Sequence, residues 1–172
     1  IDACAVASAT NPATVLINWD YTSATPGAAT PAPEPKSQHG LGLCSYLTVR
    51  CVNQRTVAFE GHAPGMNCRP ESRPCTNVTI EGCRFDGSAL ADGAVVLDLR
   101  DISNLDVSGN VIAGDQQDLV WIGGSGTKGV RVHGNTFDNW LGYRAIREVP
   151  GGEAAAIFGN VIARVTPTPT PS

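Results

Sequence analysis

The residues best suited to chemistry are three aspartates and an arginine in the middle of the chain: Asp98, Arg100, Asp115 and Asp118. Asp98 and Arg100 alternate on one expected strand, and Trp121 lies on the next. Paired carboxylates act as acid and base in glycoside hydrolysis, and clustered aspartates bind calcium. These residues are therefore candidates for a catalytic or carbohydrate-binding patch. The alternative is that Asp98 and Arg100 are ordinary solvated strand residues.

The composition favours a secreted β-protein rich in turns. Only 16% of the 172 residues are charged, and the chain contains 19 glycines and 12 prolines; about 25% charged residues is usual. A formal net charge of −4 with 12 lysines and arginines argues against a nucleic-acid partner. No apolar run approaches the ~18 residues of a membrane span. A chain that begins with Ile1 is typical of a processed product.

All six cysteines lie in the first half of the chain: Cys4, Cys44, Cys51, Cys68, Cys75 and Cys83. An even number at irregular spacing predicts disulfides, with their pairing open, in a secreted, extracellular or cell-surface protein. A zinc site is the alternative because His39 and His62 lie among them, but no Cys-x-x-Cys pair is present. Asn77 begins the N-glycosylation sequon Asn77-Val78-Thr79, which also fits secretion.

The chain divides into four regions. Residues 1–21 end in an expected strand, and residues 22–38 form a linker rich in proline, alanine and threonine. Residues 39–165 carry the β signal, and residues 166–172 alternate threonine and proline. Such a tail is typical of a spacer that carries O-linked sugars. The candidates for O-glycosylation or proline hydroxylation are Thr166, Pro167, Thr168, Pro169, Thr170 and Pro171.

The β region repeats itself. The segments 77–85, 104–112, 129–137 and 154–162 share an alternation of apolar residues followed by Gly-Asn (Gly-Cys in the first), and residues 56–62 form a weaker copy. The glycines of these copies are Gly61, Gly82, Gly109, Gly134 and Gly159, spaced 21, 27, 25 and 25 residues apart. This period predicts a solenoid of about five coils. The alternative is a set of unrelated hairpin turns.

Three rows of inward side chains follow from the alternation. They are Val57, Val78, Leu105, Val130 and Ala155; Phe59, Ile80, Val107, Val132 and Ile157; and Phe85, Ile112, Phe137 and Ile162. A second set of strands is expected over residues 46–50, 96–100, 119–122 and 145–149. Gly-Asn suits a tight corner because both residues tolerate left-handed backbone angles. We expect Asn110, Asn135 and Asn160 to form a hydrogen-bonded ladder, with Cys83 and His62 replacing asparagine in the earlier coils.

Residues 46–162, roughly two thirds of the chain, resemble the right-handed parallel β-helix superfamily of pectate-lyase-like solenoids. The resemblance rests on the Gly-Asn corners and the aliphatic rows, and it implies an all-β, short right-handed parallel β-helix whose N-terminal half is stabilised by disulfides. The linker and the Thr-Pro tail are similar in composition to the hydroxyproline-rich glycoproteins of plant and algal walls.

Many members of this superfamily are polysaccharide lyases or hydrolases, but their catalytic motifs are missing here. Glu60-Gly61-His62-Ala63 contains only part of the Gly-His-Gly motif, and no Asp-Asp pair occurs. Asn135-Thr136-Phe137-Asp138 lacks the Asn-x-Asp spacing. Five coils would also be short for walling a cleft. The sequence therefore favours a protein that is not an enzyme, and it calls for no metal and no cofactor.

A short solenoid exposes strand edges and apolar interior at both ends, which proteins either cap or use for assembly. The last coil runs directly into the Thr-Pro tail, so residues 15–21 could fold back on their own chain or pair with the next subunit. Head-to-tail addition of this kind makes a fibre.

The leading hypothesis is a secreted, glycosylated structural protein of an extracellular filament, wall or surface coat that self-associates head to tail. The alternatives are a carbohydrate-active enzyme that uses Asp98, Arg100, Asp115 or Asp118, and a glycan-binding adhesin module.

Overall fold

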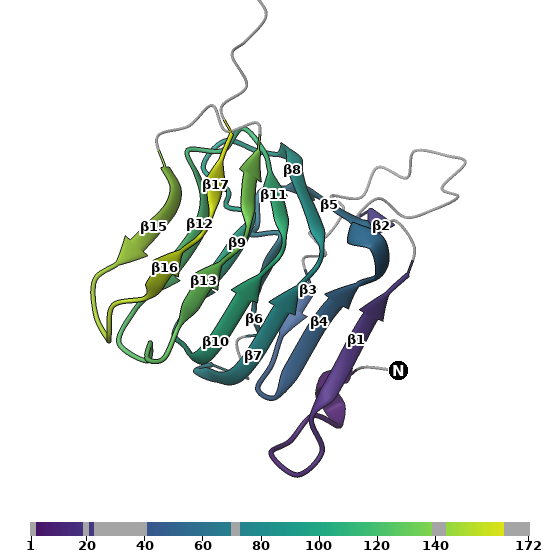
Figure 1. Ribbon diagram of the computed structural model, residues 1–172, viewed down its shortest axis with the longest axis vertical. Coiled ribbons are helices and arrows are strands. Elements are labelled where there is room, and N and C mark those ends of the chain that lie inside the picture. The colour runs from purple at the N-terminus through teal and green to yellow at the C-terminus, as the bar shows by residue number, and fades with distance from the viewer. Residues whose placement is uncertain (1–2, 19–20, 23–40, 70–72, 139–143, 164–172) are drawn as a thin grey trace, which may run out of the picture.

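The chain winds into three parallel sheets that form the sides of a β-solenoid (Figure 1). The computed structural model describes residues 3–18, 21–22, 41–69, 73–138 and 144–163. Sheet A contains β1 (Ala13–Ile17), β4 (Leu47–Cys51), β7 (Cys75–Glu81), β10 (Ile102–Ser108), β13 (Arg131–His133) and β16 (Ala156–Phe158). Sheet B contains β2 (Tyr21–Thr22), β5 (Thr56–Gly61), β8 (Arg84–Leu90), β11 (Val111–Ala113), β14 (Thr136–Asp138) and β17 (Val161–Ile162). Sheet C contains β3 (Leu41–Leu43), β6 (Met66–Cys68), β9 (Leu97–Arg100), β12 (Asp118–Gly123) and β15 (Arg144–Val149).

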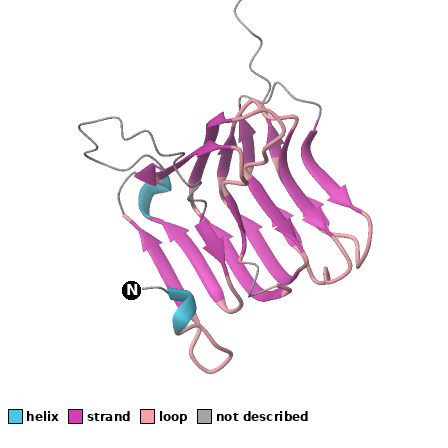
Figure 2. Cartoon of the chain, turned by 180° about the vertical axis from the view of Figure 1, so that it is seen from behind, coloured by secondary structure: helices cyan, strands magenta, loops and turns pink. Residues whose placement is uncertain are grey.

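Every pairing between these strands is parallel. In the described ranges, helix is limited to two short 3-10 turns, η1 (Ala3–Ala5) and η2 (Val52–Gln54), visible from behind in Figure 2. The expected all-β parallel solenoid is therefore confirmed. No helix in the described part of the chain is long and apolar enough to cross a membrane.

Apolar side chains of successive turns stack inside the solenoid. In sheet A, Val49, Ile80, Val107 and Val132 occupy one buried row. In sheet B, Val57, Phe85, Ile112 and Phe137 occupy another, and none of these four is exposed. β-Branched and aromatic residues suit such positions because each packs on its equivalent one turn away. Alternate residues along each strand thus build a continuous core.

A ladder of asparagines lines the corner between sheets A and B. Asn135 Oδ1 accepts hydrogen bonds from the backbone N–H and Nδ2 of Asn110, at 2.9 and 3.1 Å. Asn160 Oδ1 accepts the same pair from Asn135, at 2.9 and 3.0 Å. The Nδ2 groups of the three asparagines also donate to backbone carbonyls of the preceding turn. Asn110 donates to Ile80, Asn135 to Val107 and Asn160 to Val132. The glycine before each asparagine has φ near +63°, which a side chain would strain.

A disulfide continues this ladder toward the N-terminus. Cys83 donates its backbone N–H to Asn110 Oδ1 at 3.0 Å, and its sulfur is bonded to Cys51 one turn earlier. At this corner, which has no asparagine, a covalent bond therefore connects the neighbouring turns. The prediction that His62 takes the asparagine position was wrong, because Gly61 is the last residue of β5 rather than a corner after sheet A.

The predicted alignment of the earliest repeat was also wrong. Leu47 lies opposite Val78 in sheet A, although residues 46–50 were expected to belong with 96–100. Val57 lies opposite Phe85 in sheet B, and the ring of Phe59 stacks on Phe85. Val57 and Phe59 therefore do not belong to the two inward rows that were predicted for them. The reason is the corner at η2, which turns through the left-handed residues Asn53 and Gln54 instead of Gly-Asn.

All six cysteines form disulfides: Cys4–Cys44, Cys51–Cys83 and Cys68–Cys75. No thiolate is left for the zinc site considered as an alternative. Cys4–Cys44 ties η1 to the end of β3, and Ala3, Cys4 and Ala7 pack against the core. The N-terminal end of the solenoid therefore carries a covalently attached cap.

The strand expected before residue 21 forms within its own chain. Its first part is β1, which pairs with β4 and places Val15 opposite Val49. It extends the first turn and does not cover the last one. Most of the 22–38 linker, His39 and the Thr-Pro tail with its modification candidates lie outside the described residues.

Asn135→Ala tests the ladder. The substitution leaves the buried Asn110 N–H and the Val107 carbonyl without their partners, and each unsatisfied buried group costs about 1–3 kcal/mol. We expect the free energy of unfolding to fall by about 2–4 kcal/mol in urea titrations with the disulfides intact. Asn160→Ala, at the half-buried end of the ladder, should cost less. Equal losses for the two variants would contradict a buried ladder.

Candidate functional site

A cluster of charged side chains and one tryptophan covers the outer face of sheet C. We call it the sheet C cluster, and it consists of Arg73, Asp98, Arg100, Asp118, Trp121, Arg144 and Arg147. The strand register creates it, because Trp121 on β12 lies opposite Asp98 on β9 and Arg147 on β15. Residues far apart in the sequence thus become neighbours on one face.

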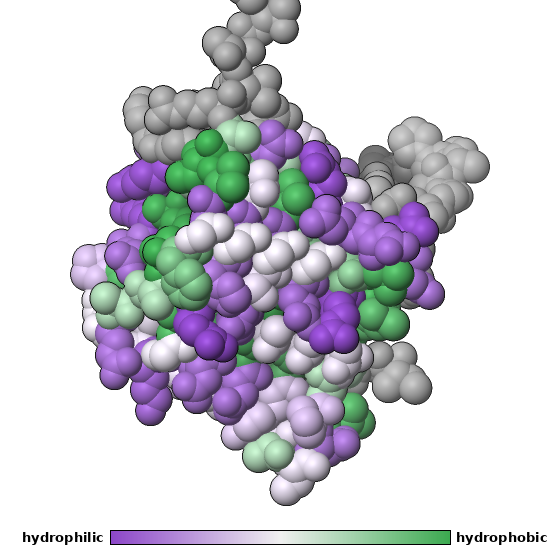
Figure 3. All heavy atoms as spheres, in the orientation of Figure 1, coloured by the Kyte–Doolittle hydropathy of each residue, from purple (hydrophilic) through white to green (hydrophobic). Residues whose placement is uncertain are grey.

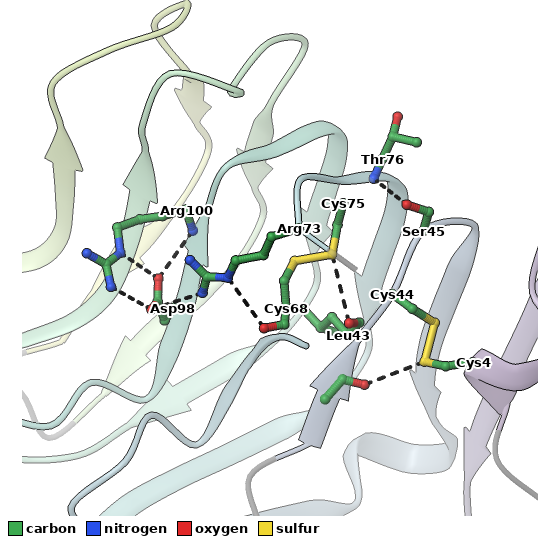
Figure 4. Close-up of a disulfide and its surroundings, with 11 residues drawn as sticks. Cys4, Leu43, Cys44, Ser45, Cys68, Arg73, Cys75, Thr76, Asp98 and Arg100 are labelled. Carbon is green, nitrogen blue, oxygen red and sulfur yellow. Dashed lines mark hydrogen bonds and ion pairs between the residues drawn. A yellow bond between two sulfur atoms is a disulfide. The ribbon is translucent and has the colours of Figure 1, made fainter. Parts of the chain in front are cut away.

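Asp98 is held by two arginines (Figure 4). Arg100 Nε and Nη2 donate to Asp98 Oδ1 and Oδ2 at 2.8 and 2.7 Å, and Arg73 Nη2 lies 3.4 Å from Oδ2. The residue is only 2% exposed. It is therefore not the solvated strand residue considered as an alternative, but a carboxylate covered by guanidinium groups.

These contacts keep Asp98 ionised. Burial would raise the pKa of Asp98, but the hydrogen bonds and the charge of Arg100, together with the charge of Arg73, lower it below its ordinary value. The Asp98 hydrogen bond raises the pKa of Arg100 in turn. The pair is a charge-assisted, bidentate bridge on the edge of the core.

Asp118 forms the second centre of the cluster. Arg144 Nε donates to its Oδ1 at 2.8 Å, and Trp121 Nε1 donates to its Oδ2 at 3.0 Å. Arg147 Nη1 lies 3.5 Å from the same oxygen. Asp118 is nearly fully buried, so its charge is compensated by these donors rather than by water.

Trp121 joins the two centres. The Arg100 guanidinium carbon lies 4.6 Å from the centroid of its ring, and that of Arg147 lies 5.8 Å away. Both distances fall within the range of cation–π attraction. Arg144 and Arg147 keep nearly half of their side-chain surface in solvent. The groups that this face offers to a ligand are therefore guanidinium groups and an aromatic ring.

The geometry disfavours acid–base catalysis by the predicted carboxylates. A general acid must hold a proton near the working pH, whereas the pKa of Asp98 is lowered. Asp118 already accepts bonds from an arginine and from Trp121. Within the described ranges, no three histidine, cysteine or acidic side chains are grouped to hold a metal ion. The arginines, in contrast, can still bind an anion with their exposed edges.

Three of the four predicted residues meet in this cluster, and the fourth does not. Asp115 is exposed in the turn before β12, where it accepts a hydrogen bond from Gln116 Nε2 at 2.9 Å. The prediction missed Arg73, Arg144 and Arg147. Arg147 was within reach of sequence reasoning, since residues 145–149 were expected one turn after Trp121.

A second candidate surface lies at the ends of the solenoid. Within the described residues, the large exposed hydrophobic side chains are Val6 and Leu16 at the N-terminal end, Val52 in η2, and Ile157, Phe158, Val161 and Ile162 at the C-terminal end. We call the last four the C-terminal end surface. Hydrophobic side chains, green in Figure 3, gather over β16 and β17.

Within the described ranges, the interior rows end in partly exposed side chains at the last turn. Ile157 and Ile162 are 42% and 55% exposed, whereas Val132 and Phe137, their equivalents one turn earlier, are fully buried. Exposed apolar side chains grouped in this way make the end a candidate interaction surface.

The predicted glycosylation residue is accessible. Asn77 is exposed at the third residue of β7, with a left-handed φ of 56°. Its Oδ1 accepts a hydrogen bond from Asn104 Nδ2 at 3.4 Å on the next turn.

The chain matches no protein-family model, no curated protein and no solved structure. Its function is therefore inferred from the fold and these surfaces.

Asp98→Asn tests the charge pairing. We expect a loss of about 2 kcal/mol in the free energy of unfolding at neutral pH, because hydrogen bonds to charged partners contribute this much. The folded pKa of Asp98 is lowered, so its stabilisation is complete above the unfolded value of about 3.9 and fades as the pH falls through the folded value. The difference between wild type and variant should therefore shrink in acid, as measured by urea unfolding from neutral to low pH.

Asp115→Asn is the matched control, since it removes an exposed aspartate outside the cluster. It should change the stability by less than about 0.5 kcal/mol. A difference between wild type and Asp98→Asn that stays constant with pH would contradict the lowered pKa.

Proposed function

We propose that this protein is a secreted structural protein whose solenoid units associate end to end in an extracellular filament, wall or surface coat. The observation that carries the proposal is the open last turn, where Ile157 and Ile162 are about half exposed, whereas the inner members of their rows are closed to solvent. Exposed rows of this kind are stabilised when another molecule covers them.

The exposed strand edges support the same conclusion. In the described part of the chain, β16 pairs only with β13 and β17 only with β14. The outer backbone groups of an edge strand form a template for another strand, and soluble proteins usually protect such edges with charge or a cap. Residues 154–163 contain no charged side chain. The edges of sheets A and B at this end therefore favour association over repulsion, whereas β15, the edge strand of sheet C, carries Arg144, Arg147 and Glu148.

The covalent features support an extracellular location. Three disulfides fit an oxidising compartment, and Asn77 is exposed for a glycan. The Thr-Pro composition of residues 166–172 suits O-linked sugars and resembles wall glycoproteins. The likeness to pectate-lyase-like solenoids supports the coil architecture, whereas the arginine-bound state of Asp98 and Asp118 counts against the catalysis known in that superfamily.

Binding of an anionic glycan by the sheet C cluster is the second candidate function. Four arginines surround two aspartates there, and Trp121 offers an aromatic face among them. Guanidinium groups recognise carboxylate or sulfate groups through paired hydrogen bonds. This activity is compatible with a structural role, because it uses a side of the solenoid and leaves the ends free.

Sedimentation of the purified glycoprotein tests the end-to-end association. We expect the weight-average mass to rise with concentration, and electron micrographs to show fibres with a regular axial repeat. Ile162→Lys should suppress this rise, because a charge would be buried at the contact. Ser88→Lys is the control: it adds the same charge at an exposed position of β8, an inner strand of sheet B, and should leave association unchanged. A wild type that stays monomeric at high concentration would refute the proposal.

Affinity electrophoresis in gels containing polygalacturonate, with dextran as the neutral polymer, tests glycan binding. Only polygalacturonate should retard the protein, and added salt should weaken the effect. Arg147→Gln should reduce retardation severalfold. Arg131→Gln removes the same charge from sheet A and should have little effect. Equal losses in both variants would show binding by net charge alone, and unsaturated or reducing-end products lost in Asp98→Ala would show catalysis instead.

A further inference from the structure

We infer that the units join in one register, in which β16 of one unit pairs in parallel with β1 of the next and Phe158 packs on Leu16. This inference rests on the end-to-end association proposed above and specifies its contact. β1 and β16 are the outermost strands at opposite ends of sheet A (Figure 1).

An outward-facing row of sheet A carries the argument. In register from strand to strand it contains Leu16, Arg50, Glu81, Ser108, His133 and Phe158. The middle of the row is polar, and Arg50 forms an ion pair with Glu81. Only the two terminal members are large and apolar, and they are 53% and 54% exposed. An apolar residue at each end of a polar row is expected where the row continues into another molecule.

Among the described residues, the apolar side chains at the two ends of this row have only partial partners. Phe158 stacks one face on the His133 ring, with the centroids 5.0 Å apart. Leu16 lies beside Arg50, whose guanidinium is bound to Glu81. Continuing the row by one strand would place Phe158 opposite Leu16 and cover both side chains. Aromatic–aliphatic pairs opposite each other in a sheet are stabilising.

The neighbouring inward row requires the same register. It runs from Val15 through Val49, Ile80, Val107 and Val132 to Ile157. A second unit that sets Leu16 against Phe158 also sets Val15 against Ile157, because Val15 precedes Leu16 and Ile157 precedes Phe158 in the sequence. Val6, exposed at the capped end, adds apolar surface there. A one-residue slip would instead turn Ile157 toward outward-facing side chains.

Charge and direction also agree with this contact. Residues 3–17 and 154–163 contain no charged side chain, so the contact buries none of their own. All strands of sheet A run parallel, so a unit shifted along the axis presents β1 to β16 in the same direction. Among the described residues, β1 pairs only with β4, which leaves its outer edge for this pairing. Such a heterologous contact does not close, and it propagates into a fibre.

Two single substitutions and their mixture test the register. Leu16→Lys and Phe158→Glu each place a charge at a position that is more than half exposed in one unit, so both should fold. Each alone should weaken association at least about tenfold in sedimentation experiments. An equimolar mixture should associate again. Where the C-terminal end of Leu16→Lys meets the N-terminal end of Phe158→Glu, the wild-type contact forms. Where the other two ends meet, the introduced lysine can pair with the introduced glutamate. Ser88→Lys on the inner strand β8 again serves as the control.

The outcomes separate the contact from the function. If Leu16→Lys associates like wild type while Phe158→Glu does not, two C-terminal ends meet and the register is overturned, whereas association itself stands. If the wild type remains monomeric, the proposed function fails first. Amide hydrogen exchange of the assembled wild type needs no variant: assembly should protect β1 and β16 together, and protection of β16 alone would overturn the inference.

Discussion

Parallel stacking is the constraint on which the structure depends. Each inner strand satisfies its backbone groups only through the strands one turn before and after it, so every position in a turn must tolerate its equivalent as a neighbour. The asparagine ladder applies this rule to a side chain. Asn135 donates to a carbonyl and to one asparagine and accepts from another, and a different residue there would break bonds on both sides. Similar residues recur at a constant spacing because each must pack against, or bond to, its equivalent in the neighbouring turns.

The same constraint makes the two ends different in kind from the middle. An inner turn has neighbours on both sides, but a terminal turn has one. At the N-terminal end the chain covers its first turn with η1 and secures it through Cys4–Cys44. In the described residues of the C-terminal end, Ile157 and Ile162 have no such cover. The disulfide Cys51–Cys83 belongs to the same pattern, since it replaces hydrogen bonds where the ladder has no asparagine.

The features that a local sequence motif marks could be predicted from the sequence. The features that depend on which strands lie side by side could not. The Gly-Asn corners at residues 109–110, 134–135 and 159–160 predicted the solenoid and most of its inward rows. The corner at η2 was missed because Asn53 and Gln54 reach left-handed angles without glycine. The coupling of Asp98 to Arg73 was invisible for another reason: it joins residues 25 apart that no repeat relates. Asp98 was expected as a solvated or catalytic group, and its burial beneath arginines follows only from the three-dimensional arrangement.

The sides and ends of the solenoid can therefore serve separate purposes. Sheet A keeps its outer face polar, through pairs such as Arg131 with Asp106 at 2.6 Å, except at the two apolar termini of one row. Sheet C instead concentrates arginines around Trp121. In an assembly that grows along the axis, this arginine-rich face would recur once per unit without being covered. A single exposed guanidinium contributes little, but repeated sites on one rigid support bind a polymeric anion with much higher effective concentration. End-to-end growth would thus convert a weak cluster into an extended binding surface, which links the two candidate functions through one geometry.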